Sequence, residues 1–223
     1  MEKYSRTEPI SETAFPIERA GIPFIGIAAF ATAVFALLGI AVLALLGLLA
    51  TFSICYFFRD PDRVTPVVDG GVVSPADGKV IKVERLESTH FTKGPCQRVS
   101  IFMSVFNVHV NRIPFDGRIA KIEYYPGKFF SANLDKASRL NEHNAVHLEA
   151  ENGQPICFVQ IAGLVARRII CRIQEGDEVV RGRRFGLICF GSRLDVYLPV
   201  DAQITVSVGD VVSAGTSLIG KLS

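Results

Sequence analysis

One long uncharged stretch limits most strongly what this chain can fold into. No charged residue occurs between Arg19 and Arg59, and these 39 positions are nearly all Ala, Leu, Ile, Val, Phe or Gly. A secretory signal peptide has an apolar core of roughly 7–15 residues, so the stretch is too long and too far from the terminus to be one. A buried helix pair of a soluble protein would show a polar face, which is lacking here. The sequence therefore predicts a membrane-embedded segment at residues 20–58.

The length of this segment indicates two helices rather than one. A single helix of 39 residues would extend about 58 Å, twice the ~30 Å hydrocarbon core of a bilayer. Two short spans or a re-entrant hairpin fit better, with Gly39 as the expected break and Gly47 as the alternative. Arginines flank the segment at Arg19, Arg59 and Arg63. By the positive-inside tendency, we expect both ends on the cytoplasmic face.

The composition agrees with one membrane-anchored domain. A chain of 223 residues suits one domain with an appendage, and its net charge of +2 excludes few partners. The mean hydropathy of +0.32 is high for a soluble domain, and the apolar excess lies near the N-terminus. The five cysteines form no C-x-x-C pair and have no His at zinc-ligand spacing, which argues against a disulfide framework or a metal site. In a cytoplasmic domain they would be reduced thiols.

The chain changes character where the apolar segment ends. Phe57–Pro66 carries two prolines and four charges, so residues 1–66 are predicted to be the anchor and linker and residues 67–223 a β-rich domain. There, short β-branched and aromatic stretches alternate with turn residues, which predicts a compact, mostly antiparallel β domain. The expected strands are Gly71–Ser74, Gly78–Val83, Arg98–Val105, Val108–Ile113, Gly117–Tyr125, Ala145–Leu148, Ile156–Ala162, Ile169–Ile173, Phe185–Phe190 and Leu194–Leu198. One helical turn is expected within Lys136–Asn144.

A repeated turn pattern indicates a particular kind of β domain. Gly176–Gly182 and Gly209–Gly215 both read G-D-x-V-x-x-G, and Ser74–Val80 is a related strand-turn-strand. Glycine and Asp supply tight turns between strands. The pattern is similar to biotinyl/lipoyl-type barrel-sandwich domains and to sugar-phosphotransferase carrier domains. A membrane-tethered carrier or binding module is therefore one functional alternative, although the Met-Lys hairpin that would carry a lipoyl cofactor is missing.

A small Gly-Ser pair interrupts the strand-like stretch Cys189–Pro199. Gly191 lets the backbone bend or be approached closely, and the hydroxyl of Ser192 could attack a carbonyl group. A β-bulge or hairpin turn is the simpler interpretation of these residues alone. The stretch by itself leaves both interpretations open.

Several polar residues are candidates for chemistry or binding. Asp77 fits an ordinary turn aspartate. Asn107, His109 and Asn111 would share one face of a strand, which favours a polar pocket around an imidazole suited to proton transfer, with a core histidine as the alternative. Polar loops with Lys128, Asn141 and Asn144 could be plain surface or could hold a polar headgroup. Next to a membrane anchor a basic surface would face anionic lipid, at about 1 kcal/mol per charge; it comprises Arg167, Arg168, Arg181, Arg183 and Arg184.

Taken together, the segments resemble the short bacterial form of the phosphatidylserine decarboxylase proenzyme. Single motifs are weak, but their order and joint presence extend over nearly the whole chain. After the apolar hairpin, the matching segments are Tyr56–Pro61, Ser74–Gly78, Asn107–Arg112, Gly127–Phe129, Asp135–Ser138, Asn141–Asn144 and Phe190–Asp195.

The resemblance implies a self-processing enzyme of the bacterial inner membrane with a cytoplasmic catalytic domain. Ser192 would attack the Gly191 carbonyl to give an ester, β-elimination would leave a dehydroalanine, and hydrolysis would release ammonia and leave a pyruvoyl group. The products would be a β chain, residues 1–191, and an α chain, residues 192–223, held as a heterodimer that could assemble further. The pyruvoyl ketone would form a Schiff base with phosphatidylserine and convert it to phosphatidylethanolamine and CO₂.

The residue roles of the family carry over unevenly. Asp77 matches the aspartate of the Asp-His-Ser self-cleavage group, and His109 matches the histidine assigned to proton transfer. Longer members have a second histidine where this chain has Arg112, which leaves one imidazole for cleavage and decarboxylation. His143 stands where the short form usually has arginine. The expected substrate contacts are Lys128, Asn107, Asn141 and Asn144, and neither a metal nor a nucleic acid is expected.

Overall fold

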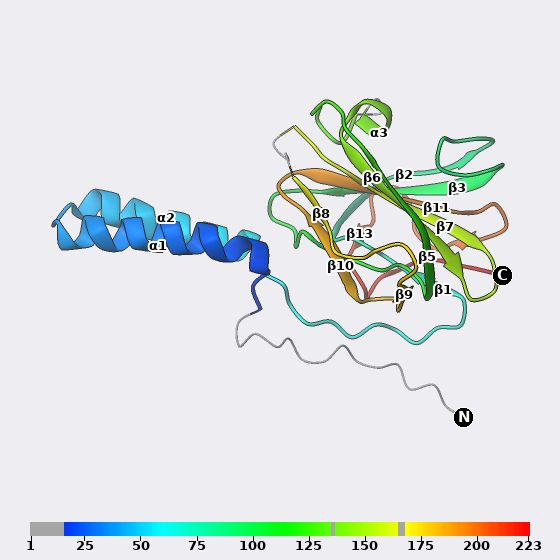
Figure 1. Cartoon of the computed structure of the whole chain (residues 1–223), viewed down its shortest axis with the longest axis horizontal. Helices are drawn as coiled ribbons and strands as arrows, with labels where there is room; N and C mark the ends of the chain where they lie inside the picture. The colour runs from blue at the N-terminus through cyan, green and yellow to red at the C-terminus, as the bar shows by residue number, and fades with distance from the viewer. Residues whose placement is uncertain (1–15, 135–136, 165–167) are drawn as a thin grey trace. The chain divides into compact units, whose positions relative to one another are not determined.

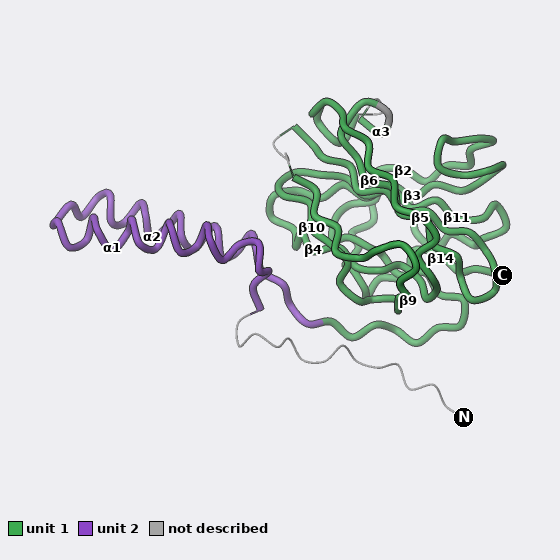
Figure 2. The backbone as a smooth tube through the Cα atoms, in the orientation of Figure 1, with its two compact units in different colours: residues 1–7, 63–223 green, residues 8–62 purple. Residues whose placement is uncertain are grey.

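The computed structural model describes residues 16–134, 137–164 and 168–223. Among these, residues 16–62 form one compact unit and residues 63–223 form another (Figure 2). Asp135 and Lys136, which belong to one matching segment, and Arg167, from the expected basic surface, lie outside the described residues.

The first unit consists of two apolar helices. After the 3₁₀ turn Arg19–Gly21, helix α1 spans Ile22–Leu37 and helix α2 spans Ala41–Phe57. Gly39 lies between them with φ +72°, a left-handed conformation that glycine adopts without strain, so the chain turns at the expected position. Gly47 instead lets α2 approach α1, since a Cβ there would overlap the hydroxyl of Thr32. The apolar N-terminal helix is confirmed: Arg19–Leu37 is long and apolar enough to cross a membrane, whereas α2 is shorter.

In its described residues, the second unit is built from three antiparallel sheets and one short helix, α3 (Ala137–Leu140), which confirms the predicted mostly β, antiparallel domain (Figure 1). The largest sheet has the order β13-β2-β3-β11-β7-β6-β5-β9 and is strongly curled. Its strands are β2 Gly78–Leu86, β3 Cys96–Met103, β5 Gly117–Tyr125, β6 His143–Ala150, β7 Pro155–Ile161, β9 Glu178–Val179, β11 Ser192–Pro199 and β13 Val211–Val212. The two smaller sheets are β1 (Gly71–Val73)-β14 (Leu218–Lys221)-β12 (Gln203–Ile204) and β4 (Val110–Arg112)-β10 (Arg184–Ile188)-β8 (Ile169–Cys171).

The main core includes apolar side chains from all three sheets. Leu194, Val196 and Leu198 alternate along β11 and point into this core, as the period of two for a strand requires. The opposite face of β11 is also buried, because Tyr197 packs there with Val159 of β7 and with Phe91 from the β2–β3 loop. β11 is therefore a central strand covered on both faces, which explains its nearly continuous burial.

The repeated G-D-x-V-x-x-G pattern forms two equivalent turns at opposite edges of the large sheet. β13 pairs with β2 at one edge, and β9 pairs with β5 at the other. In each turn the aspartate accepts a hydrogen bond from the backbone N–H three residues before it: Asp177 from Gln174 at 2.8 Å and Asp210 from Ser207 at 2.9 Å. All four glycines have positive φ. The turn function predicted for these residues is confirmed.

One expected strand is shorter than the sequence predicted. Only Val110–Arg112 of the segment Val108–Ile113 pairs as β4. The carboxamide oxygen of Asn107 accepts hydrogen bonds from the N–H and the hydroxyl of Ser104, both at 2.8 Å. Such local bonds offer the backbone an alternative to a sheet ladder, so Asn107 lies in a turn rather than on the strand face.

Candidate active site

Several of the segments that carry the family resemblance meet at one end of the large sheet, where β2, β6 and β11 begin and β3 and β7 end. Ser192 pairs with Met103, and Arg193 pairs with Ile161, so Ser192 lies beside Ala162, which follows β7. The start of β6 lies next to Ala162, because the N–H of Ala162 donates to the carbonyl of Glu142 at 2.9 Å. On the other side, β2 begins at Gly78 next to β3. Asp77 therefore precedes a strand end about 10 Å from Ser192, two strand spacings away.

Ser192 is a fully buried hydroxyl group at the start of β11. Its Oγ donates to the sulfur of Met103 at 3.5 Å. A thioether is a weak acceptor and no base, so this contact orients the hydroxyl without removing its proton. The same sulfur accepts from the Asn111 amide at 3.7 Å, and that side chain is in turn bonded to Gln160 at 2.9 Å and through it to Asn144 at 3.2 Å. Ser192 thus ends a chain of buried polar side chains.

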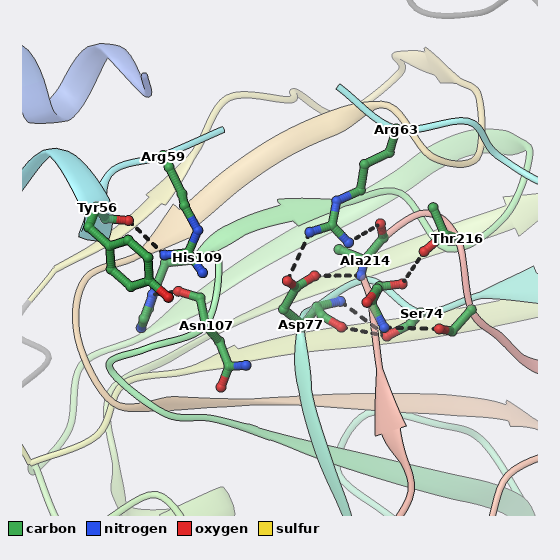
Figure 3. A network of polar contacts seen from close by, with 12 residues as sticks. Tyr56, Arg59, Arg63, Ser74, Asp77, Asn107, His109, Ala214 and Thr216 are labelled. Carbon is green, nitrogen blue, oxygen red and sulfur yellow. Dashed lines mark hydrogen bonds and ion pairs between the residues drawn. The ribbon is translucent and has the colours of Figure 1, made fainter. Parts of the chain in front are cut away.

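His109 is completely buried just before β4. The register of β4 with β10 places it beside Ile188, shortly before the Gly191–Ser192 pair. Its Nδ1 lies 2.9 Å from the backbone carbonyl of Asn107 (Figure 3). Because a carbonyl oxygen only accepts, Nδ1 must carry the hydrogen, and Nε2 then carries the basic lone pair of the neutral ring. The ring is therefore fixed in a tautomer that can accept a proton at Nε2.

Asp77 is largely buried and is held by two partners. Its Oδ2 accepts from the guanidinium of Arg63 at 2.8 Å, and its Oδ1 accepts from the backbone N–H of Ala214 at 2.7 Å (Figure 3). Ala214 is the sixth residue of the second G-D-x-V-x-x-G turn. These contacts fix the Pro-Ala-Asp-Gly turn at the start of β2, as the ordinary turn interpretation expects.

The sequence contains a second turn of the same kind that motif reading did not single out. Pro114-Phe115-Asp116-Gly117 repeats Pro75-Ala76-Asp77-Gly78 at the start of β5. Asp116 accepts from the N–H of Arg181, the sixth residue of the first repeat, at 3.0 Å, and it also forms an ion pair with the Arg181 side chain at 3.4 Å. Asp77 and Asp116 are therefore structurally equivalent. The shared P-x-D-G spacing was the signal that could have found Asp116.

The four expected substrate contacts have different surroundings. Lys128 has an exposed side chain, and its backbone bonds to the segment before β6, so it lies at the same sheet end. Asn107 is partly exposed. Asn141 is buried and bonds to both backbone groups of Phe130 and to the Ala162 carbonyl. These bonds make Asn141 a support of the loop, and Asn144 belongs to the buried polar chain described above.

His143 lies in an aromatic cluster. Its ring stacks on Tyr125, with centroids 4.7 Å apart, and meets Phe91 edge-on at 5.5 Å. Its Nδ1 lies 2.7 Å from the carbonyl of Asn141, so this ring also carries its hydrogen at Nδ1. At the position where the resemblance leads us to expect arginine, His143 thus contacts Tyr125, Phe91 and the Asn141 carbonyl.

A buried ion pair on β11 is a feature that the sequence reading missed. Arg193 binds Asp195 through two hydrogen bonds of 2.6 and 2.8 Å and donates to Ser100 at 3.0 Å, and Arg193, Asp195 and Ser100 are all fully buried. The two residues are two positions apart on one strand, so they lie on the same face. That spacing was visible in the sequence, but charged residues are almost never fully buried unless paired, so burial was not expected.

Cys157 and Cys171 are poor nucleophiles. Burial raises the pKa of the Cys171 thiol, and it raises the pKa of Cys157 further. Both are therefore uncharged thiols at neutral pH, and the thiolate is the reactive form. None of the five cysteines, all of which lie in the described part of the chain, forms a disulfide.

An open cavity of about 900 Å³ is not lined by Ser192, His109 or Asp77; its lining includes Asp69, Asp116, Glu151, Arg181 and Lys221. The Arg181 side chain bonds to Asp116 and to the carbonyls of Val68 and Gly71. Arg181 is therefore largely engaged within the domain, which differs from the lipid-facing surface expected for it. Arg168 and Arg183 are exposed.

Comparison with known proteins identifies the family. The family description "Phosphatidylserine decarboxylase" matches residues 51–220. Proteins named phosphatidylserine decarboxylase proenzyme are similar over almost their whole length: that of Desulfotalea psychrophila is 48% identical over 93% of this chain and 97% of its own. Those of Syntrophus aciditrophicus and Nitratidesulfovibrio vulgaris are 51% and 52% identical over 92% and 91% of this chain, and 96% and 93% of their own. The chain belongs to the phosphatidylserine decarboxylase family.

Proposed function

We propose that this chain is a proenzyme that cuts its own Gly191–Ser192 bond and then decarboxylates phosphatidylserine to phosphatidylethanolamine in phospholipid biosynthesis. The observation that carries the proposal is the place of Ser192: a fully buried hydroxyl group that begins a central strand directly after Gly191. The names of the relatives, which describe proenzymes, support the same activity.

The surroundings of Ser192 fit a covalent pyruvoyl group. The site is buried, so a ketone there would be shielded from bulk water, and the Ser192 position is fixed by pairing to Met103 on β3. The pyruvoyl group would supply an electrophilic ketone that binds the substrate amine and accepts the electron pair released when CO₂ departs. Rigid strands on either side hold the reacting position in place.

Self-cleavage needs one nucleophile and one proton acceptor. Ser192 Oγ forms a bond to the Gly191 carbonyl carbon while the C–N bond breaks, and the hydroxyl proton ends on the freed amine, which leaves an ester. Removal of the Ser192 α-proton then expels the Gly191 carboxylate with the Cβ–O electrons. His109 fits the role of proton carrier because the Asn107 carbonyl fixes its tautomer with Nε2 as the basic nitrogen. Asp77 would assist cleavage from the start of β2, which is separated from β11 by β3.

The same end of the domain is suited to a lipid substrate. The loops that follow β3 and β7 and precede β6 and β11 expose large apolar side chains, which soluble proteins do not usually gather in one place. This apolar rim consists of Val105, Phe106, Leu134, Leu140, Leu164 and Phe190. Lys128 and Arg168 are exposed in the same loops and would face anionic headgroups. Lys128 and Asn107 would contact the serine headgroup, Asn141 would hold its loop in place, and Asn144 would support the buried polar chain that ends at Ser192.

The apolar helices would anchor the enzyme in the bacterial inner membrane, with the catalytic domain on the cytoplasmic side. Helices α1 and α2 carry no charged side chain, and arginines occur at both ends of the pair. Charges of that sign are retained on the cytoplasmic face. An enzyme tethered in this way would meet phosphatidylserine without extracting it from the bilayer.

Variants at Ser192 test the proposed function. Ser192→Ala should abolish both chain cleavage and release of CO₂ from phosphatidylserine vesicles, because no hydroxyl remains to attack Gly191. Ser192→Cys keeps a nucleophile and should retain slow cleavage, which controls for damage to the fold. Membrane association should be the same in all three proteins, since the anchor is untouched. Formation of phosphatidylethanolamine by Ser192→Ala would contradict the proposal.

A further inference from the structure

A glycine far away in sequence touches the carbonyl group of the proposed scissile bond. Gly163 is buried and follows β7, and a Cβ on residue 163 would overlap the carbonyl oxygen of Gly191 and lie 3.0 Å from its carbonyl carbon. The φ of Gly163 is not in the left-handed region, so the backbone would accept alanine and only the contact excludes it. Gly191 itself has space, because the nearest atom to a Cβ there is 4.0 Å away.

Phe190, which precedes Gly191, has a strained backbone. Phe190 has φ +66° and is the one non-glycine residue with positive φ among those that the structure describes. This region is disfavoured for a residue with a bulky side chain, because its Cβ approaches the following carbonyl oxygen. The Phe190 side chain is 41% exposed, so packing of the ring in a core does not account for the conformation.

Both ends of the strained connection are held by the sheets. The N–H of Cys189 donates to the Arg168 carbonyl at 3.1 Å, directly after the pairing of Ile188 with Ile169. On the other side, Ser192 is already paired with Met103. Phe190 and Gly191 must therefore connect two fixed strands of different sheets, and the connection cannot relax without breaking this pairing. Strain of this kind persists where surrounding structure over-determines it, and it clusters at functional sites.

We propose that Gly163 and the left-handed Phe190 form a clamp that holds the Gly191 carbonyl in place for attack by Ser192. The inference rests on the proposed self-cleavage. The backbone at Gly163 fixes the carbonyl oxygen from one side, and the strain at Phe190 is released when the C–N bond between Gly191 and Ser192 breaks. Both act as positioning residues for cleavage, and neither acts on the lipid. After cleavage, Gly191 is the free end of the β chain and no longer needs this conformation.

Two variants of Phe190 separate backbone strain from the ring. Phe190→Ala removes the ring but keeps a Cβ, so the strain remains, whereas Phe190→Gly removes both. Purified precursor is incubated, and appearance of the fragment of residues 192–223 is followed on a denaturing gel and by intact mass. Phe190→Ala should be cut at close to the wild-type rate, and Phe190→Gly should be cut roughly tenfold more slowly. Equal rates for the two variants would overturn the role of strain.

A second pair of variants tests the contact at Gly163. Gly163→Ala displaces the Gly191 carbonyl and should slow cleavage by on the order of a hundredfold. Gly186→Ala is the matched control, because its Cβ would overlap the backbone carbonyl of Ile170 within the β8–β10 pair and would disturb the fold to a similar degree. If Gly163→Ala and Gly186→Ala lose the same thermal stability, Gly186→Ala should still be cut faster than Gly163→Ala. Cleavage of Gly163→Ala at the rate of the control would overturn the role of Gly163.

Hydroxylamine shows which step is blocked. Under mild neutral conditions it cuts esters and leaves peptide bonds intact, so it cuts at residue 191 only a chain that has completed the first acyl shift but has not yet undergone elimination. Uncut Gly163→Ala should resist hydroxylamine because its ester does not form, whereas a hydroxylamine-sensitive precursor would place the defect after the attack and overturn the clamp. A wild-type chain that is never cut would overturn self-cleavage as well, whereas a wild type that is cut together with all variants at one rate would overturn the clamp alone.

Discussion

Asp77 and Asp116 occupy equivalent turns but are expected to differ in function. Each follows a Pro-x, precedes a Gly, accepts a backbone N–H from the sixth residue of a G-D-x-V-x-x-G turn and pairs with an arginine. A purely structural role therefore accounts for the contacts made by either aspartate. The two differ in position, because Asp77 lies at the sheet end that carries Ser192 and Asp116 lies at the start of β5 near the opposite edge.

This equivalence provides a matched test of Asp77. Asp77→Asn and Asp116→Asn each lose an ion pair and weaken one hydrogen bond to the backbone, so each should lower the free energy of unfolding by about 1–2 kcal/mol. Only Asp77→Asn should slow self-cleavage, which a denaturing gel measures during incubation of the purified precursor. If both variants are cut at the same rate, Asp77 is a turn residue and has no part in the chemistry.

Single residues of the site differ in how far the sequence could predict them. Ser192 and His109 became candidates because a hydroxyl after glycine and an imidazole among polar neighbours are visible locally, but their proposed roles came from the family resemblance. The tautomer of His109 depends on the Asn107 carbonyl, which only the folded loop brings to it. Gly163 could not be assigned, since its contact is with a residue 28 positions away and depends on the pairing of β7 with β11.

At the level of the element, β11 combines the proposed nucleophile with a buried ion pair. Ser192 shares the face of β11 that points into the main core, whereas Arg193 and Asp195 lie on the other face. The pair is bidentate and also bonded to Ser100. It therefore fixes the start of the strand from the side opposite the serine, and after cleavage it would hold the new end of the α chain.

Removal of one partner of this ion pair should destabilise the fold much more than replacement of both partners. Arg193→Met leaves Asp195 buried, with Arg98 4.0 Å away as the remaining cation, and should lower the free energy of unfolding by about 3–5 kcal/mol. The double variant Arg193→Met with Asp195→Leu replaces the ions by apolar groups and should recover most of this loss. Denaturant unfolding of the full chain in detergent measures both. A double variant less stable than Arg193→Met would contradict this view of the pair.

Strand positions followed from the sequence more closely than strand partners. Gly117–Tyr125 was predicted with its observed bounds, because alternating residues between two turn signals define a strand locally. The order of the large sheet, in which β11 lies between β3 and β7, depends on contacts between distant segments that no local pattern encodes. The failure at Val108–Ile113 has a local cause, because the side-chain bonds of Asn107 compete with the ladder.

In the whole molecule, the proposed membrane anchor and the proposed catalytic groups belong to different units of the chain. Residues 16–62 contain the two apolar helices, and residues 63–223 contain every group assigned to cleavage or decarboxylation. The apolar rim and exposed basic side chains belong to the second unit, so that unit would contact lipid by itself once the helices have brought it to the bilayer.

The intact mass of the purified full-length protein tests the central claim most directly. Self-cleavage predicts two polypeptides, residues 1–191 and residues 192–223, and the smaller one should be lighter by one ammonia than the fragment that simple hydrolysis would give, because its first residue is a pyruvoyl group rather than serine. It should also resist stepwise degradation from its N-terminus. An active preparation that contains only the uncut chain of 24.3 kDa would contradict the claim.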